Sequence, residues 1–226
     1  MKTAILLSGC GVYDGSEIHE SVMAMLALKQ NNLDYICTAP NIKQHHVINH
    51  TNGEELHQER NVLQESARIA RGQIVSLSKL ELEKISSLVI VGGFGAAKNL
   101  SSWAFMGSKG GVLKEVKDLI LYFIKNKKPI VALCISPTLI AKSTEGTEYY
   151  PKLTLGSQKE SSEYNISEIN EAISSIGAIP NDSSINEICV DEDLKIITAP
   201  CYMMNANIEE IYINIKMSID KLSSFL

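Results

Sequence analysis

One short stretch constrains the fold of this chain most: an apolar run that ends in a cysteine and continues into a helix. Residues 130–133 (Ile-Val-Ala-Leu) follow the basic, turn-like segment 125–129 and are typical of a buried strand in a parallel sheet. Cys134 comes next, and Ser136 and Pro137 are favourable as the N-cap and the first residue of a helix. The stretch therefore predicts a sharp strand-to-helix turn that carries a cysteine.

The neighbours of Cys134 decide whether this turn can present a nucleophile. A side chain held on such a turn needs small residues two places before and after it, where strand and helix approach closely. Ala132 and Ser136 occupy these places, so the pattern indicates a cysteine version of the nucleophile elbow. A free cysteine buried as a small apolar residue is an equally good interpretation of this stretch alone.

Apolar runs and amphipathic stretches alternate along the rest of the chain. Further strands are predicted at residues 3–8, 34–39, 74–77, 88–91 and 153–156, and a β-hairpin at 188–198. Helices are predicted up to residue 30 and at 61–71, 111–125, 136–142, 161–175 and 205–225. This order predicts an α/β fold with a mostly parallel sheet and helices on both faces.

The first helix has a polar start and an apolar stripe. Asp14 or Ser16 is expected to cap it. Apolar residues recur at helical spacing and are expected to face the sheet, namely Ile18, Val22, Met25 and Leu26.

Composition limits the classes of function. With 226 residues the chain is expected to form one domain over residues 1–226. A net charge of −5 gives no electrostatic reason to expect nucleic acid or an anionic membrane as partner, and no apolar run approaches the roughly 20 residues of a membrane span. The N-terminus is interpreted as a first strand and not as a signal or transit peptide.

The five cysteines are dispersed and form no C-x-x-C pair, which argues against a disulfide framework and against a zinc site. No metal is expected, and a reducing cytoplasm is the expected compartment.

A thiolate that attacks a carbonyl group needs donors for the developing oxyanion. The elbow offers the backbone N–H of Ile135, at the start of the following helix. A second donor is expected from Gly92-Gly93, because glycine lets the backbone approach a ligand closely. The alternative is that these glycines only form a tight turn.

The acid or base partner of Cys134 is less clear from the residues. All five histidines precede residue 58, so a catalytic triad with its histidine downstream of the cysteine is excluded. The remaining candidates are Glu17 and Glu20 in the first helix, or a histidine from residues 45–57. Glu20 lies deeper in the helix and is the better candidate for a buried carboxyl with a raised pKa. Both glutamates can equally be favourable charges of a first helical turn.

Four segments carry a resemblance to a known family. They are Ser8-Gly-Cys-Gly-Val-Tyr-Asp-Gly-Ser-Glu-Ile-His-Glu20, Val47-Ile-Asn-His50 with Gly53-Glu54, Val91-Gly-Gly-Phe-Gly-Ala-Ala-Lys-Asn-Leu100 and Val190-Asp-Glu-Asp193 with Lys195-Ile196. Together they resemble the ElbB subgroup of the ThiJ/PfpI superfamily. The resemblance implies a flavodoxin-like three-layer sandwich, a homodimer, and a nucleophilic cysteine with a glutamate beside it.

By their positions in these motifs, Cys134 matches the nucleophile and Glu20 the glutamate, ahead of Glu17. Gly93 and Ile135 match the amides of the oxyanion site. The chain departs from the superfamily in two places. The histidine that several members place after the cysteine is absent, and Ser136 stands where many relatives have glycine.

The resemblance implies a glyoxalase that converts a small α-oxoaldehyde such as glyoxal to its hydroxy acid through a hemithioacetal on Cys134, without a cofactor. His50 is a candidate for a second proton carrier. The rival hypothesis is an accessory regulatory protein of isoprenoid biosynthesis in which Cys134 is an oxidation sensor. An amidotransferase is disfavoured by the missing downstream histidine.

Overall fold

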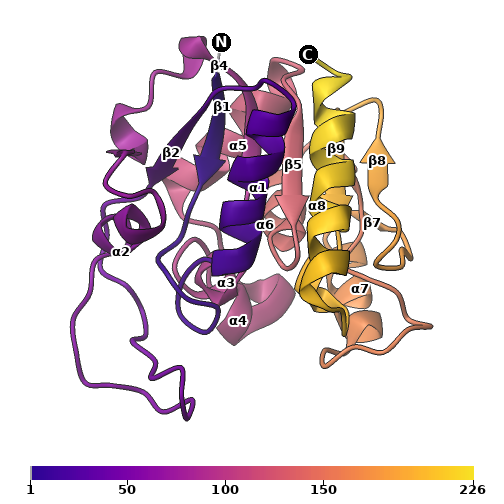
Figure 1. Cartoon of the computed structure of the whole chain (residues 1–226). Coiled ribbons are helices and arrows are strands. Elements are labelled where there is room, and N and C mark those ends of the chain that lie inside the picture. Colours follow the sequence, from indigo (N-terminus) through magenta and orange to yellow (C-terminus); the bar gives the residue numbers. More distant parts are fainter. Residues whose placement is uncertain (1) are drawn as a thin grey trace.

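The computed structural model describes residues 2–226, which form a seven-stranded sheet covered by helices on both faces (Figure 1). The strand order is β3-β2-β1-β4-β5-β9-β8, and every neighbouring pair is parallel except β8 and β9. The strands are β1 (Lys2–Leu6), β2 (Tyr35–Ala39), β3 (Ile74–Ser76), β4 (Ile85–Ile90), β5 (Ile130–Leu133), β8 (Cys189–Asp191) and β9 (Ile196–Ala199). A separate two-stranded sheet pairs β6 (Lys152–Leu153) with β7 (Ile179–Pro180).

The helices form the outer two layers. One face is covered by α1 (Ile18–Gln30), α2 (Val62–Ile69) and α8 (Ile208–Ser223), with α1 and α8 side by side in front of the sheet in Figure 1. The remaining helices are α3 (Phe94–Lys98), α4 (Trp103–Met106), α5 (Lys114–Lys125), α6 (Pro137–Thr144) and α7 (Ile166–Ser174). Short 3-10 turns are η1 (Leu77–Lys79), η2 (Leu82–Lys84), η3 (Gly107–Lys109) and η4 (Cys201–Met203). This arrangement confirms the predicted flavodoxin-like three-layer sandwich.

Successive residues of the central strands point to opposite faces of the sheet, so they divide between two apolar cores. In β4, Leu88 and Ile90 pack with α5 and α6, whereas Val89 packs with α1 and α8. In β5, Ile130 belongs to the core on the α5 and α6 side, and Val131 to the core on the α1 and α8 side. Both faces of these strands are buried, which is why their sequences are apolar without alternation.

Three local expectations differ from the structure. Asp14 and Ser16 do not cap α1; Glu17 does, and its carboxylate accepts the backbone N–H of Glu20 at 2.7 Å. Ser136 precedes α6 but makes no side-chain cap, because its hydroxyl donates to the carbonyl of Ile90 in β4 at 2.9 Å.

The third difference concerns the face of α1 that meets the sheet. Three residues of the predicted contact stripe, Ile18, Val22 and Leu26, point outward and are exposed. The fourth, Met25, is half-buried and packs against the core. The buried side instead carries Ser21, Ala24, Ala27 and Leu28 beside Glu20. Ala24, Ala27 and Leu28 belong to the apolar core, and the small side chains of Ser21, Ala24 and Ala27 let the helix approach the sheet closely.

Candidate active site

Cys134 lies at the carboxyl end of β5 in a left-handed backbone conformation, with φ +58°. Its amide donates to the carbonyl of Ala199 in β9 at 2.9 Å, which continues the ladder of the sheet through the turn. Ala132 and Ser136 are both fully buried on either side of it. A non-glycine residue in this conformation is uncommon, and it aims the side chain off the end of the strand as an elbow requires.

Glu20 reaches the same point from the first turn of α1 and is completely buried. Its Oε2 atom accepts the backbone N–H of Gly92 at 3.0 Å, whereas Oε1 is buried without a well-aligned hydrogen bond from residues 2–226. Burial and the nearby carboxylate of Glu17 raise the pKa of Glu20 to about 8. A neutral acid at physiological pH is therefore the stable form of this group.

The Cys134 thiol and the Glu20 carboxyl are close enough to act on each other's proton. Burial and the charge of Glu20 raise the pKa of Cys134, while the amides of Gly93 and Ile135 lower it. When Glu20 holds a proton, its charge no longer opposes the thiolate and its O–H can donate to the sulfur. The two acids thus form a pair that shares protons, as closely spaced acidic groups do.

The two glycines after β4, Gly92 and Gly93, differ in what their backbone amides contact. The amide of Gly92 is used by Glu20, so it is not a free oxyanion donor. A Cβ atom at Gly92 would lie 2.4 Å from the Cβ of Cys134 and 2.6 Å from Oε2 of Glu20, which excludes any side chain there. Gly93 has φ +92°, and its amide faces the cysteine together with that of Ile135. Of the three predicted donors, the structure therefore brings Gly93 and Ile135 to the sulfur.

A cavity of about 240 Å³ opens above the thiol. Its walls come from the loop after β1, the turn after β4, helices α3, α4 and α7, and η4. The lining residues are Val12, Glu17, Gly93, Phe94, Ala97, Trp103, Ala104, Cys134, Ile135, Tyr164, Ile169, Tyr202 and Met203. The cavity lies at the carboxyl edge of the parallel sheet, where ligands bind in open α/β folds.

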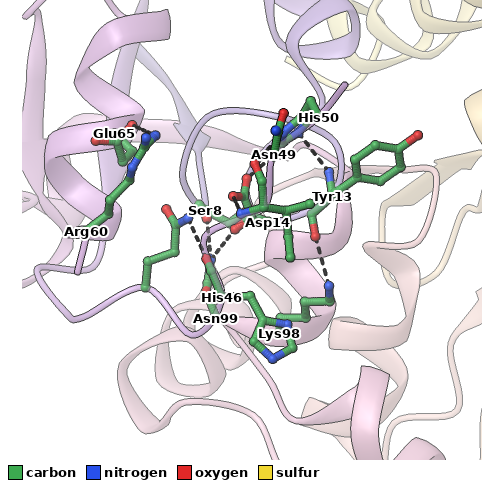
Figure 2. A network of polar contacts seen from close by, with 12 residues as sticks. Ser8, Tyr13, Asp14, His46, Asn49, His50, Arg60, Glu65, Lys98 and Asn99 are labelled. Carbon is green, nitrogen blue, oxygen red and sulfur yellow. Dashed lines mark hydrogen bonds and ion pairs between the residues drawn. The ribbon is translucent and has the colours of Figure 1, made fainter. Parts of the chain in front are cut away.

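His50 is not among the residues that line this cavity. It lies in a polar network that holds the loop before α1 (Figure 2). Its Nε2 atom accepts the backbone N–H of Tyr13 at 3.2 Å and lies 3.9 Å from Oδ1 of Asp14, whose Oδ2 accepts the amide of Ile48. The structure thus places this predicted accessory proton carrier in a loop contact, away from Cys134.

Sequence reasoning missed the aromatic walls. Trp103, Tyr164 and Tyr202 come from three distant segments, namely α4, the loop before α7 and η4, which meet only in the folded chain. Tyr202 is also joined to α1, since its hydroxyl and the Nδ1 atom of His19 are 2.8 Å apart. No periodicity or motif in these segments marks them as parts of one site.

Within the described residues, no group of three or more His, Cys, Asp or Glu side chains is arranged to hold a metal ion. None of the helices in residues 2–226 is long and apolar enough to cross a membrane.

The fold and the site together define a class, namely flavodoxin-like proteins with a cysteine at a strand-to-helix elbow and a buried carboxyl beside it. No family model matches the chain. The rat protein named ES1 protein homolog, mitochondrial, is 40% identical over 223 residues, which is 98% of this chain and 82% of the relative. The human glutamine amidotransferase-like class 1 domain-containing protein 3, mitochondrial, is 39% identical with the same coverage.

Solved structures agree with these relatives. A crystal structure of an isoprenoid biosynthesis protein with an amidotransferase-like domain from Ehrlichia chaffeensis is 33% identical, with a TM-score of 0.89 over 100% of this chain and 99% of that one. The chain therefore belongs to the family of the ES1 proteins and of their ElbB-like, amidotransferase-like relatives. Drosophila melanogaster DJ-1beta, 14% identical with a TM-score of 0.54 over 99% of this chain and 96% of that one, shares the fold.

The expected cytoplasmic location is wrong by these comparisons. The rat, human and zebrafish (Danio rerio) relatives are all named as mitochondrial proteins, which points away from the cytoplasm. The expectation rested on cysteine usage. The five cysteines are indeed all free, but free thiols do not distinguish one reducing compartment from another.

Proposed function

We propose that the protein is a cofactor-independent glyoxalase that converts glyoxal or a related α-oxoaldehyde to its hydroxy acid. The observation that carries the proposal is the arrangement of four groups at one point. They are the thiol of Cys134, the raised-pKa carboxyl of Glu20, and the backbone amides of Gly93 and Ile135. A nucleophile, a proton carrier and two oxyanion donors are the parts that an aldehyde isomerisation requires.

The first step forms a carbon–sulfur bond. The Cys134 thiolate adds to the aldehyde carbon, and the π electrons of the C=O bond move to oxygen, where the amides of Gly93 and Ile135 can stabilise the charge. Glu20 then gives its proton to this oxyanion, which yields a hemithioacetal and leaves Glu20 as a carboxylate.

The next steps move hydrogen between the two carbons. The Glu20 carboxylate removes the proton of the former aldehyde carbon and delivers it to the oxygen of the neighbouring carbonyl, which gives an enediol. Glu20 then takes the hydroxyl proton at the sulfur-bearing carbon and delivers it to the neighbouring carbon, which gives a thioester, so one carbon is oxidised and the other reduced without an external oxidant. Water attacks the thioester and gives one proton to Glu20, the C–S bond breaks, and the hydroxy acid leaves with the thiolate and the protonated Glu20 restored.

The polarity of the cavity argues against a glutamine amidotransferase. Glutamine carries a carboxylate that needs a cationic partner, and the lining residues include no Lys, Arg or His. The only charged side chain among them is Glu17, which would repel a carboxylate. The cavity thus suits an uncharged carbonyl compound better than an amino acid.

The test is cofactor-free turnover of glyoxal and methylglyoxal by the wild type, Cys134→Ala and Glu20→Gln. We expect glycolate and lactate from the wild type, no product above background from Cys134→Ala, and a loss of at least about 100-fold in kcat for Glu20→Gln, the range of a lost general acid or base. Circular dichroism should show that both variants remain folded. Turnover retained by Cys134→Ala would reject the mechanism.

A second candidate is suggested by the name of the Ehrlichia relative, an isoprenoid biosynthesis protein. In this case Cys134 is an oxidation sensor in an accessory protein, and its sulfenic acid is the signal. A wild type that forms no acid product, but whose Cys134 is alkylated and reversibly oxidised by peroxide faster than its other four cysteines, would favour this function.

A further inference from the structure

The cavity above Cys134 is larger than a small dialdehyde needs. A water molecule occupies about 30 Å³ in the liquid, so a cavity of about 240 Å³ has the volume of roughly eight waters. Glyoxal would fill only part of this space and would leave the distant walls without contact. Unfilled apolar volume contributes nothing to binding, because the atoms that line it have no partners.

The walls of the cavity are aromatic and apolar. Phe94 and Tyr164 are neighbours in the lining and contact each other as a tilted pair, with ring centroids 6.2 Å apart. Trp103, Ile169 and Met203 complete the apolar lining, and Trp103 is almost fully buried. An aromatic and apolar lining favours a flat apolar ligand group, because offset and edge-to-face contacts with the rings add to the gain from burial.

The lining of the cavity offers no cationic side chain to an anionic ligand. Glu17 is the one charged residue that lines the cavity, and its carboxylate is fixed by the amide of Glu20 at the start of α1. Lys98 lies beside Phe94, with its Nζ atom 5.2 Å from the centroid of that ring. This Nζ atom donates to the carbonyl of Tyr13 at 2.9 Å, and Lys98 is not among the residues that line the cavity. An anionic ligand would therefore lose its hydration without gaining a cationic side chain, while the amides of Gly93 and Ile135 serve the oxyanion that forms at the thiol.

From volume, aromatic walls and charge, we propose that this cavity binds an uncharged carbonyl compound that carries an aryl group or an apolar group of similar size. The proposal rests on the proposed function for its chemistry: the substrate is then an aryl-substituted α-oxoaldehyde, held with its aldehyde carbon at Cys134 and its ring among Phe94, Trp103 and Tyr164. Glyoxal is a poorer substrate because it reaches the thiol without using the walls.

Two measurements test the proposal separately from catalysis. Trp103 is the only tryptophan of the chain and lines the cavity, so its fluorescence reports what enters. Acetophenone, a neutral aryl ketone without an aldehyde, should change this fluorescence with a saturable dependence. Benzoate, which has a similar size and a negative charge, should require at least about ten times the concentration, or show no saturation.

Turnover gives the second measurement. The wild type should have a kcat/KM for phenylglyoxal at least about ten times that for glyoxal, each corrected for the Cys134→Ala background.

Ala104 lines the cavity and is exposed, so Ala104→Leu reduces the space in the cavity without disturbing the core. It should lower the phenylglyoxal-to-glyoxal ratio at least about fivefold. The matched control, Ala67→Leu in α2, lies outside the cavity and should leave the ratio unchanged.

The outcomes separate the two proposals. Saturable acetophenone binding without turnover of any aldehyde supports the ligand class and rejects the glyoxalase. Cys134-dependent turnover that prefers glyoxal, with the same ratio in Ala104→Leu and Ala67→Leu, keeps the glyoxalase and overturns the ligand class. Benzoate binding as tight as that of acetophenone also overturns it.

Discussion

At the scale of single residues, Glu20 is the group whose chemistry burial changes most. With its pKa raised from 4.5 to about 8, the folded protein holds this proton more tightly than the unfolded chain does. The stabilisation that comes from holding this proton is therefore fully present below about pH 4.5, where Glu20 is protonated in both states. It declines as the pH rises and is lost above about pH 8, where the folded protein also loses the proton. Each unit of pKa difference corresponds to about 1.4 kcal/mol.

Glu20→Gln should remove this dependence, because an amide keeps the acceptor for Gly92 and has no proton to lose in this range. We expect the free energy of unfolding of the wild type, measured in urea, to fall relative to that of Glu20→Gln as the pH rises from 5 to 8. Curves that stay parallel across this range would show that the folded protein holds Glu20 as a carboxylate.

Gly92 offers a sharp steric test. Ala at this position places a Cβ atom 2.4 Å from that of Cys134 and 2.6 Å from Oε2 of Glu20, so the thiol and the carboxyl must separate. A misplacement of about 1 Å in a catalytic group can lower the rate on the order of 100-fold. We expect Gly92→Ala to lose turnover to that extent. Gly111→Ala is the matched control, because no atom lies within 4 Å of its Cβ position. Equal activity of the two variants would contradict the geometry.

Residue types alone predicted part of this arrangement, each time beside an alternative. The small neighbours of Cys134 indicated an elbow or a buried free cysteine, and the depth of Glu20 in its helix indicated a buried carboxyl or a charge of the first turn. The use of the Gly92 amide by Glu20 was not predictable, because it depends on how closely α1 approaches the turn after β4. That distance is set by Ala24 and Ala27 on the inner face of α1.

At the scale of elements, Asn99 holds two loops to the end of α3. Its Nδ2 atom donates to the carbonyls of Ser8 and Asp14, each at 2.8 Å (Figure 2). Its Oδ1 atom accepts the amide of His45, also at 2.8 Å. The first two bonds fix the loop before α1, and the third fixes the start of the long segment 45–58. One buried side chain thus couples the loop that positions Glu17 to a segment that has little regular structure of its own.

Asn99→Ala should therefore loosen both loops. Removing one partner of a buried hydrogen bond costs about 1–3 kcal/mol, and we expect a loss of stability in this range. Trypsin should cleave after Lys43 or Arg60 faster than in the wild type, as followed by mass spectrometry. Asn126→Ala, which removes a single exposed bond at the end of α5, is the control. Equal cleavage rates in the two variants would show that Asn99 does not hold the segment.

Elements were predictable where periodicity and flanking residues agree. The β8–β9 hairpin around residues 191–193 and the capped helix α8 both confirm their predictions. The prediction was wrong for the face of α1, because a hydrophobic stripe indicates a buried side only when nothing else competes for it. The inner side of α1 must accommodate Glu20 and a close contact with the sheet, which small residues allow.

At the scale of the whole molecule, the sheet follows from the sequence because its central strands are apolar on both faces. The cavity could not be predicted from the sequence, since it depends on the spatial order β1-β4-β5-β9, which brings together segments far apart in the chain.

The exposed apolar stripe of α1 is also recognisable only in the whole molecule. Ile18, Val22 and Leu26 are 43%, 50% and 48% exposed and lie one turn apart on one side of the helix.

We propose that this stripe is where a second copy of the chain binds, in agreement with the homodimer that the family resemblance implies. Contiguous exposed apolar residues on a soluble protein are typical of interaction sites, and a twofold interface uses the same patch on both subunits. Val22 is the middle residue of the stripe. A carboxylate at this position would face either the same carboxylate or an apolar side chain of the second copy, and both contacts disfavour association.

Val22→Glu should therefore shift the protein from dimer to monomer, with a dissociation constant raised at least about 100-fold, which sedimentation velocity over a range of concentrations measures. Ile179→Glu is the control, because Ile179 is 52% exposed but lies in β7, in the separate two-stranded sheet. It should leave the assembly unchanged. A wild type that sediments as a monomer at all concentrations, or a Val22→Glu variant that remains as dimeric as Ile179→Glu, would show that α1 is not the dimer surface. The exposed stripe would then be free for a different partner.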